Sequence, residues 1–201
     1  METLDAIAKR RSIKEFDAGH KFSKSEEESL LRAAMLAPTS FNIQHWRFVI
    51  IRDPALREKI RKDHGNDQAQ MTDASLLIAM TADVKAWAKS PERYWRHAPE
   101  EVANLLVNWM GPFHDGRDWL QRDEAQRSIG MAMQNLMLAA TAMGYHSCPM
   151  IGFDIEEVAK LINLPDDHVM GPMVAVGKGI KEPWPKGGQL ALEEVIIENG
   201  F

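Results

Sequence analysis

The sequence predicts an α+β fold in which a central mixed sheet is sandwiched between helices. Short, continuously apolar runs recur along the chain, as strands covered on both faces require, and segments with helical spacing of apolar residues separate them. Strands that alternate with helices place a sheet between helical layers. The chain has 201 residues, 45% of them hydrophobic, which suffices for one domain with a substantial core. No internal repeat or linker divides it, so residues 1–201 are predicted to form a single domain.

Composition excludes several classes of partner. A net charge of −5 lacks the basic excess that neutralising a phosphate backbone requires, so we expect no nucleic-acid partner. The single cysteine, Cys148, excludes an intrachain disulfide and fits a reducing compartment. Residues 1–16 contain no apolar signal segment, and no stretch approaches the ~20 apolar residues that span a bilayer. We therefore expect a cytoplasmic protein with no membrane partner.

Two helices are predicted before residue 38. Thr3 can cap the first, and its residues Leu4, Ile7 and Ala8 share one face. Ser25 and Glu28 have the spacing of a capping box for the second. Pro38 is expected to end this helix, whose predicted buried stripe comprises Leu30, Leu31, Ala34 and Met35.

Four strands are predicted from apolar, branched or aromatic runs. They cover residues 46–51, 76–81, 147–151 and 169–177. The helices between them have their own signals. Asp53 with Pro54 opens one, Asp154 with Glu157 caps another that runs to Asn163, and a third covers residues 124–143. Gly144 is expected to end this third helix as a left-handed C′ residue.

Two regions have a weaker pattern. Residues 84–123 form a variable helical excursion, whose tryptophans could line a substrate channel or pack as cover (Trp87, Trp95, Trp109 and Trp119). The tail from Lys181 is rich in proline and glycine and ends in a predicted edge strand over residues 193–197. Such a tail is typical of segments that reach a partner subunit.

The first candidate binding segment follows the first helix. Arg10, Arg11, Ser12 and Lys14 place three cations and a hydroxyl within five residues. Arginine offers a planar fork of donors to phosphate oxygens, and serine adds another donor, so the cluster suits an anionic ligand. The alternative is a solvated basic patch without a ligand.

The second candidate is the loop over residues 38–45. Its side chains offer donors and acceptors between a helix and a strand, which suits the rim of a flat polar heterocycle. Ordinary turn chemistry is the alternative. The residues concerned are Pro38, Thr39, Ser40, Asn42 and Gln44.

The two segments together carry a resemblance to a known family. The order of RRS at residues 10–12, APTSFNIQHW at residues 37–46, PMIGFD at residues 149–154 and a closing GK before a proline-rich stretch and LALEEVI is similar to that of the FMN-dependent nitroreductase family. The resemblance runs from Leu4 to the C-terminus and is weakest over residues 84–124. It implies a three-layer sandwich with a mixed, mostly antiparallel sheet.

The resemblance implies roles in binding FMN. Arg10, Arg11 and Ser12 would hold the phosphate and ribityl chain, and Lys14 would approach the pyrimidine. A cation there stabilises the negative charge of reduced flavin. The loop containing Pro38, Thr39, Ser40, Asn42 and Gln44 would meet the same flavin from the other subunit of a homodimer, with the tail reaching across.

Further FMN contacts are implied on both sides of the ring. Asp67 and Gln70 match positions at the pyrimidine edge, where some relatives have lysine in place of Gln70, so we expect a lower reduction potential here. The segment Pro149, Met150, Ile151 and Gly152 resembles the one that lies along the flavin, with a backbone N–H directed at N5. The relatives' C-terminal arginine is missing, so the phosphate contact falls to Lys186 or to Lys178, beside Gly179.

The resemblance also implies an activity. NAD(P)H would donate hydride transiently, and a nitroaromatic, a quinone or a similar small-molecule electron acceptor would then take its place, which gives ping-pong kinetics. The alternatives are an enone reductase, a dehalogenase or a flavin-degrading enzyme of the same fold, or a non-catalytic flavin sensor. No protein general acid and no metal are assigned, because His97, His114 and Asp115 match no ligand spacing and read as surface residues. Cys148 reads as a small buried residue.

Overall fold

The sheet has four strands, all antiparallel to their neighbours. The computed structural model describes residues 1–201, and the strands run in the order β1-β2-β4-β3. Their bounds are β1 Trp46–Ile50, β2 Leu76–Asp83, β3 His146–Met150 and β4 His168–Gly177. The parallel component is a single isolated bridge between Ser12 and Ser147. The predicted α+β fold is confirmed, with a sheet that is mostly antiparallel.

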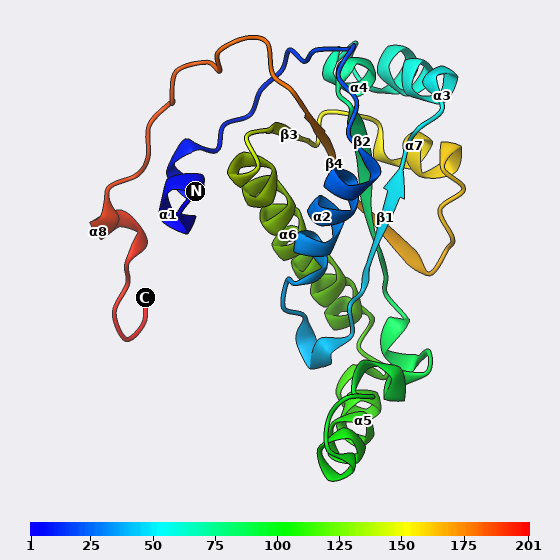
Figure 1. The fold of residues 1–201 in the computed structure, drawn as a ribbon. Coiled ribbons are helices and arrows are strands. Elements are labelled where there is room, and N and C mark those ends of the chain that lie inside the picture. Colours follow the sequence, from blue (N-terminus) through cyan, green and yellow to red (C-terminus); the bar gives the residue numbers. More distant parts are fainter.

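Helices cover both faces of this sheet (Figure 1). The helices α2 and α6 lie on one face, and α3, α4 and α7 on the other. The α-helices are α1 Thr3–Lys9, α2 Lys24–Met35, α3 Pro54–Lys59, α4 Gln70–Asp73, α5 Glu100–His114, α6 Asp118–Ala142, α7 Ile155–Leu161 and α8 Leu192–Val195. Four short helices complete the fold: η1 Ser40–Asn42, η3 Ala86–Ala88 and η4 Pro91–Tyr94 are 3-10 helices, and η2 Ile60–His64 is a π-helix.

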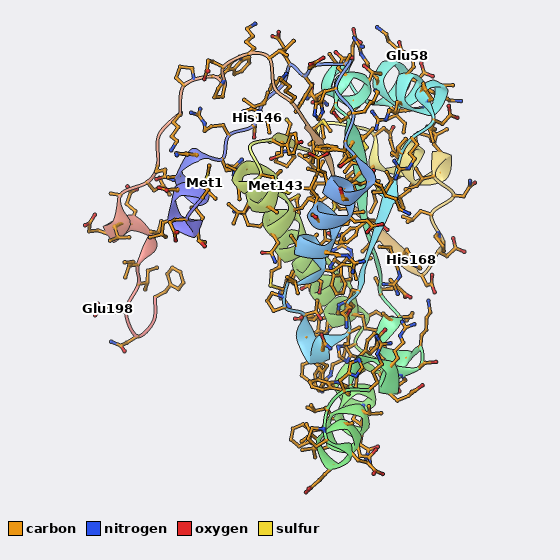
Figure 2. All side chains as sticks on the ribbon, viewed as in Figure 1. Met1, Glu58, Met143, His146, His168 and Glu198 are labelled. Carbon is orange, nitrogen blue, oxygen red and sulfur yellow. The ribbon has the colours of Figure 1, made fainter.

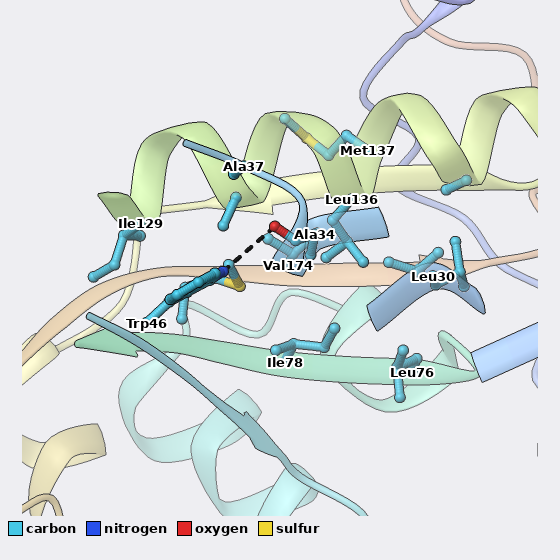
Figure 3. Packing of buried hydrophobic residues seen from close by; sticks show 14 of the residues in the cluster. Leu30, Ala34, Ala37, Trp46, Leu76, Ile78, Ile129, Leu136, Met137 and Val174 are labelled. Carbon is cyan, nitrogen blue, oxygen red and sulfur yellow. Dashed lines mark hydrogen bonds between the residues drawn. The ribbon is translucent and has the colours of Figure 1, made fainter. Parts of the chain in front are cut away.

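The two layers explain why β2 is apolar at successive positions. All its residues are buried, and alternate ones belong to different clusters: Ile78 packs with the α2 and α6 layer, and Leu77 with the other. Figure 3 shows the first cluster, in which Trp46 lies against α2 and donates a hydrogen bond from Nε1 to the carbonyl oxygen of Ala34 at 3.4 Å. The continuous apolar run is thus a consequence of a sheet buried on both faces.

Several boundaries differ from the predictions. Glu2, not Thr3, is the N-cap of α1, and Ser23 with Glu26, not Ser25 with Glu28, forms the capping box of α2. Both serine–glutamate pairs have the required spacing. The helix begins after the earlier pair: Ser23 has the extended backbone of an N-cap, and it forms both capping-box hydrogen bonds with Glu26. The stripe of α2 is also narrower, since Met35 is 52% exposed.

The C-terminal tail forms no strand. Residues 193–197, predicted as an edge strand, overlap the one-turn helix α8, which covers Leu192–Val195. A strand needs a neighbour for its backbone groups, and the tail runs along α1, away from the sheet (Figure 1). Figure 2 shows Glu198 projecting from the body of the molecule.

The excursion over residues 84–123 forms a small unit of its own. It comprises η3, η4, α5 and the start of α6, which begins at Asp118 and not at the predicted residue 124. A separate apolar cluster joins it to the loop before β1 through Ile43, Tyr94 and Met110. Trp87 and Trp95 pack against this cluster, while Trp109 and Trp119 are exposed, so the tryptophans divide between packing and surface. No helix of the structure combines the length and the apolar character needed to cross a bilayer.

Candidate functional site

The elbow segment, residues 10–14, is fixed to the edge of the sheet. It leaves the C-terminus of α1, and Ser12 bridges to Ser147 on β3. The backbone N–H of Ile13 donates to the carbonyl oxygen of Ser147 at 3.1 Å, and the Ile13 side chain is buried. Backbone pairing and a buried anchor therefore hold the cations on either side of Ile13 in place.

The chain after β4 runs beside the elbow segment. Asp17 donates its N–H to the carbonyl oxygen of Lys178 at 2.8 Å, and a bridge joins Phe16 to Gly179. A Cβ on Gly179 would lie 2.9 Å from Cγ2 of Ile13. Gly179 therefore permits close packing of backbone against the elbow segment.

The elbow segment and the tail enclose a cavity of about 430 Å³. Five cations line it, together with the carboxylates of Glu15 and Glu182, and one of the five, Lys181, forms an ion pair with Glu15. The other four form no ion pair with a carboxylate: Arg10, Arg11, Lys14 and Lys186. A concave site with unpaired guanidinium and ammonium groups favours an anion, above all a phosphate. We call this site the cationic cavity.

Trp184 closes part of the cationic cavity from the tail. Its ring lies 4.5 Å from Nζ of Lys14, within cation–π range, and its carbonyl oxygen accepts a hydrogen bond from Arg11. Nζ of Lys186 donates to the carbonyl oxygen of Ala8 at 3.3 Å. The tail is therefore held to α1 and the elbow segment by the same cations that face the cavity.

The structure distinguishes the two lysines predicted for the phosphate. Lys186 lines the cationic cavity, and Lys178 does not. Nζ of Lys178 is directed to Asp17, with an N–O distance of 3.9 Å. The geometry favours Lys186.

The rim loop, residues 38–44, lies at the opposite end of the sheet. It leads into Trp46, which pairs with Ala82 near the end of β2, whereas the elbow segment meets Ser147, whose partner on β4 is Val176, next to the start of β2. The eight residues of β2 span about 26 Å. One chain therefore does not bring the elbow segment and the rim loop together.

The rim loop has a strained backbone that is held by one hydrogen bond within the loop and one to η4. Phe41, Asn42 and Gln44 have φ values of 50°, 55° and 54°, in the left-handed region. Thr39 Oγ1 accepts the Gln44 N–H at 3.0 Å, and Asn42 Nδ2 donates to the carbonyl oxygen of Tyr94 at 2.8 Å. The side chains of Pro38 and Ser40 form no hydrogen bond within the chain, and the Ser40 hydroxyl is free to bind a ligand.

The segment after β3 lies near the elbow segment. Pro149 and Met150 are the last residues of β3, and Ile151 and Gly152 follow as exposed residues. The carbonyl oxygen of Gly152 accepts hydrogen bonds from two amides, Asn66 Nδ2 at 3.0 Å and Gln68 Nε2 at 2.8 Å. Sequence reasoning missed these two residues. The turn signal Gly65-Asn66-Asp67 could have indicated them.

Gln70 and Asp67 occupy different surroundings. Gln70 is buried, and its Nε2 donates to Oε1 of Gln68 at 3.0 Å. The carboxylate of Asp67 is bound by Lys62 and Arg61 at 2.9 and 2.8 Å, and these bonds hold the pKa of Asp67 below its ordinary value. Gln70 thus lies on the side of β3, and Asp67 on the side of η2.

The buried titratable groups outside the cavity, Cys148, His114 and His45, pack in the interior of the protein. Burial raises the pKa of the Cys148 thiol, which fits the packing role predicted for it. His114, predicted as a surface residue, is fully buried, and its Nδ1 donates to the carbonyl oxygen of Met110 at 2.8 Å. Its ring stacks on Trp87, which explains why an imidazole enters this apolar cluster. Burial likewise lowers the pKa of His45 to about 4.

One cluster has side chains that metal ions prefer. Asp83, Asp167 and His168 have ligand atoms within 4.8 Å of one another. Nζ of Lys89 bonds to both carboxylates, at 2.7 and 2.6 Å. The ammonium group bridges the two acids, and the guanidinium of Arg47 lies 3.9 Å from Asp83, so the cluster is an ion-pair network that ties the excursion to β2 and β4.

Comparisons with known proteins agree with this fold and site. The sequence pattern described as "Nitroreductase family" matches residues 7–178. Protein DrgA of Synechocystis is 66% identical over 178 residues, covering 89% of this chain and 84% of its own. A protein of Staphylococcus epidermidis, provisionally described as an NAD(P)H:FMN oxidoreductase, has a TM-score of 0.90 at 25% identity over 98% of this chain and 95% of its own. A structure from Exiguobacterium sibiricum in complex with FMN has a TM-score of 0.89 at 26% identity over 98% and 97% of the two chains.

The sheet between helical layers and the cationic cavity define an α+β enzyme of the oxidoreductase class. The chain belongs to the nitroreductase family.

Proposed function

We propose that the chain is an FMN-dependent oxidoreductase that takes hydride from NAD(P)H and reduces nitroaromatics, quinones or similar small acceptors. Membership of the family and the FMN in the Exiguobacterium structure support the class of reaction. The observation that carries the proposal is the cationic cavity, with its four unpaired cations. No ion pair within this chain satisfies them, so an anionic group is the natural partner.

The cavity residues fit FMN. Arg10, Arg11 and Lys186 would bind the phosphate, with the Ser12 hydroxyl as a further donor. When bound, FMN supplies the two-electron chemistry that no side chain of this protein can perform. Lys14 would neutralise the charge of the reduced ring, and Gln70, a neutral amide, stabilises that charge less than a lysine would. The segment from Pro149 to Gly152 would form one wall.

A homodimer completes the site in this proposal. The rim loop lies at the far end of the sheet from the elbow segment of its own chain, so the loop that closes each site would come from the partner. The apolar residues of α1 and the tail are exposed here, among them Leu4 at 78%, Leu192 at 64% and Val195 at 58%. Burial of such residues against a second copy would stabilise the dimer.

The tail has a complementary surface on the same chain. A groove beside β1 is lined by Leu31, Trp46 and Phe48 and by three arginines, Arg47, Arg93 and Arg96. The tail over residues 190–201 combines apolar residues with three glutamates. We propose that the partner's tail occupies this groove, at the free edge of β1, and so reaches across the dimer.

Kinetics would follow from one site that serves both substrates. Because NAD(P)H and the acceptor would use the same open face in turn, we expect ping-pong kinetics, with parallel lines in double-reciprocal plots. Solvent would supply protons to the acceptor, since no titratable side chain is placed for that role.

A reduction assay tests the proposal. The purified protein should be yellow or become yellow with added FMN, bleach anaerobically with NADPH or NADH, and regain its colour on addition of a quinone or nitroaromatic acceptor. A protein that binds FMN but is not reduced would be a flavin-binding protein without this activity. A protein that cannot bind FMN would contradict the proposal entirely.

A further inference from the structure

The backbone after β3 forms a tight turn whose Gly152 carbonyl oxygen is held by two side-chain amides. The Phe153 N–H donates to the carbonyl oxygen of Ile151 at 2.9 Å, which closes a three-residue turn around Gly152. The turn is open to solvent, with Ile151 63% exposed. The Gly152 carbonyl oxygen accepts the amides of Asn66 and Gln68 at 3.0 and 2.8 Å. Two donors on one carbonyl fix the direction of this turn.

These amides come from a strained turn, which we call the amide turn (residues 65–70). It follows the π-helix η2, and Asn66 and Asp67 both have a φ of 52°. A Cβ on Gly65 would lie 2.8 Å from the carbonyl oxygen of Ile60, so the turn packs more tightly than another residue would allow. π-Helices and left-handed non-glycine residues concentrate at functional sites, because each costs stability that the fold must offset.

The surroundings also fix the orientation of the Gln68 amide. Nε2 of the buried Gln70 donates to Oε1 of Gln68, so the other end of the Gln68 amide, Nε2, must donate, and it does so to Gly152. Asp67 clamps the turn from the other side through Arg61 and Lys62. Two linked amides, Gln70 and Gln68, thus run from the interior beside β3 to the Gly152 carbonyl, and Asn66 donates separately to the same oxygen.

We infer that Asn66 and Gln68 are positioning residues. Their amides hold the Gly152 turn, so that the backbone N–H of this segment keeps a fixed direction toward the flavin. The inference rests on the proposed function, in which this segment is one wall of the FMN site. Donors that are held in place stabilise the negative charge of reduced flavin more than they stabilise the neutral oxidised form. Loss of the amides therefore changes the balance between the two redox forms more than it changes the binding of oxidised FMN.

Neutral variants test this inference without adding charge. Asn66→Gly keeps the left-handed backbone, and Gln68→Met keeps the approximate length of the side chain; both remove the donor. Gln126→Met is the matched control, because Gln126 Nε2 also donates to a backbone carbonyl, that of Met170 at 3.2 Å, outside the proposed site. FMN affinity, the flavin reduction potential and the rate of flavin reduction by NADPH or NADH are measured for each variant.

We expect the Asn66→Gly/Gln68→Met double variant to bind oxidised FMN within threefold of wild type. The preference for reduced over oxidised FMN should fall about tenfold, which corresponds to a potential about 30 mV more negative, and hydride transfer should slow by a similar factor. Gln126→Met should match wild type in all three measurements.

Two outcomes overturn the inference. One is a double variant that retains the potential and the reduction rate of wild type, and the other is loss of FMN binding itself, which would make the amides direct ligands. If the double variant fails to fold, Asn66→Gly alone must show the same shift in smaller measure. A wild-type protein that binds no FMN contradicts the proposed function, and that result is seen before any variant is made.

Discussion

The elbow segment and the rim loop are built in opposite ways. The cations of the elbow segment have no carboxylate partners, while its backbone is anchored to β3. The rim loop carries no charge, and its polar side chains at Thr39 and Asn42 hold its own left-handed backbone. The difference indicates that the elbow segment supplies charge to a ligand and the rim loop supplies shape. Variants of the two regions should therefore fail in different ways.

The largest expected effect is on ligand affinity at the elbow segment. Arg10→Ala/Arg11→Ala should weaken FMN binding roughly 1,000-fold, because two charge-assisted interactions are lost at about 2 kcal/mol each. The melting temperature without FMN should change little, since Arg10 has no side-chain partner in the chain and Arg11 loses only one exposed hydrogen bond, to the carbonyl oxygen of Trp184. Fluorescence titration of FMN measures the affinity. An affinity within tenfold of wild type would show that the cationic cavity does not hold the phosphate.

The next expected effect concerns His45, which follows the rim loop. It is an effect on the stability of the fold, and it depends on pH. The pKa of His45 is lowered to about 4 because the side chain is buried, with a further contribution from His114. His45 of the unfolded chain binds a proton near pH 6.5, whereas the folded chain binds it only near pH 4. The contribution of His45 to the free energy of unfolding is therefore fully present above pH 6.5 and is lost as the pH falls toward 4, by about 3 kcal/mol in total.

Urea unfolding between pH 4 and 7 measures this dependence. His45→Asn should reduce the slope, whatever its effect on absolute stability, and the remaining slope is expected from His114, whose pKa burial also lowers. A wild-type stability that stays constant from pH 6.5 to 4.5, or a variant with an undiminished slope, would contradict the assignment to His45.

A smaller effect separates strain from hydrogen bonding in the rim loop. Asn42→Gly keeps the left-handed backbone and loses the bond to Tyr94, at a cost of about 1 kcal/mol. Asn42→Ala loses the bond and also strains the backbone, so it should cost about 2 kcal/mol. Equal stabilities of the two variants in urea unfolding would mean that the positive φ of Asn42 carries no cost.

The smallest effect on FMN affinity distinguishes two lysines at the other end of the sheet. Lys186→Ala should weaken FMN binding about tenfold, as expected for one partly exposed phosphate contact. Lys178→Ala, whose lysine pairs with Asp17 outside the cavity, should change affinity less than twofold. The reverse order in the same titration would return the phosphate contact to Lys178.

Local signals in the sequence predicted the ends of helices well where a single capping residue decides where the helix begins or ends. Asp53 caps α3 and Asp154 caps α7, as their side chains alone indicate, and Gly144 takes the left-handed position after α6. Where two signals of equal quality competed, as at Ser23 and Ser25, the sequence could not decide between them. The tail strand failed because a strand depends on a neighbour that this chain does not offer.

The candidate site divides in the same way. The cations of the elbow segment are visible as a run in the sequence, and the structure gathers them around one cavity with Lys186. The turn signal at residues 65–67 could have indicated the turn that contains Asn66, but the roles of Asn66 and Gln68 depend on a contact with Gly152, more than 80 positions away, which this signal does not encode. Likewise the burial of His114, at the end of α5, depends on Phe41 of the rim loop and Trp87 of η3, whose rings pack against it.

A mixed dimer tests most directly whether two chains share each site. One subunit carries Arg10→Ala/Arg11→Ala in the elbow segment, and the other carries Ser40→Trp in the rim loop, with different affinity tags for isolation. Each variant homodimer should bind FMN weakly, whereas the mixed dimer should bind one FMN per dimer with wild-type affinity, because one of its two sites combines both intact segments. A mixed dimer with no restored site would show that the elbow segment and the rim loop do not close on the same flavin.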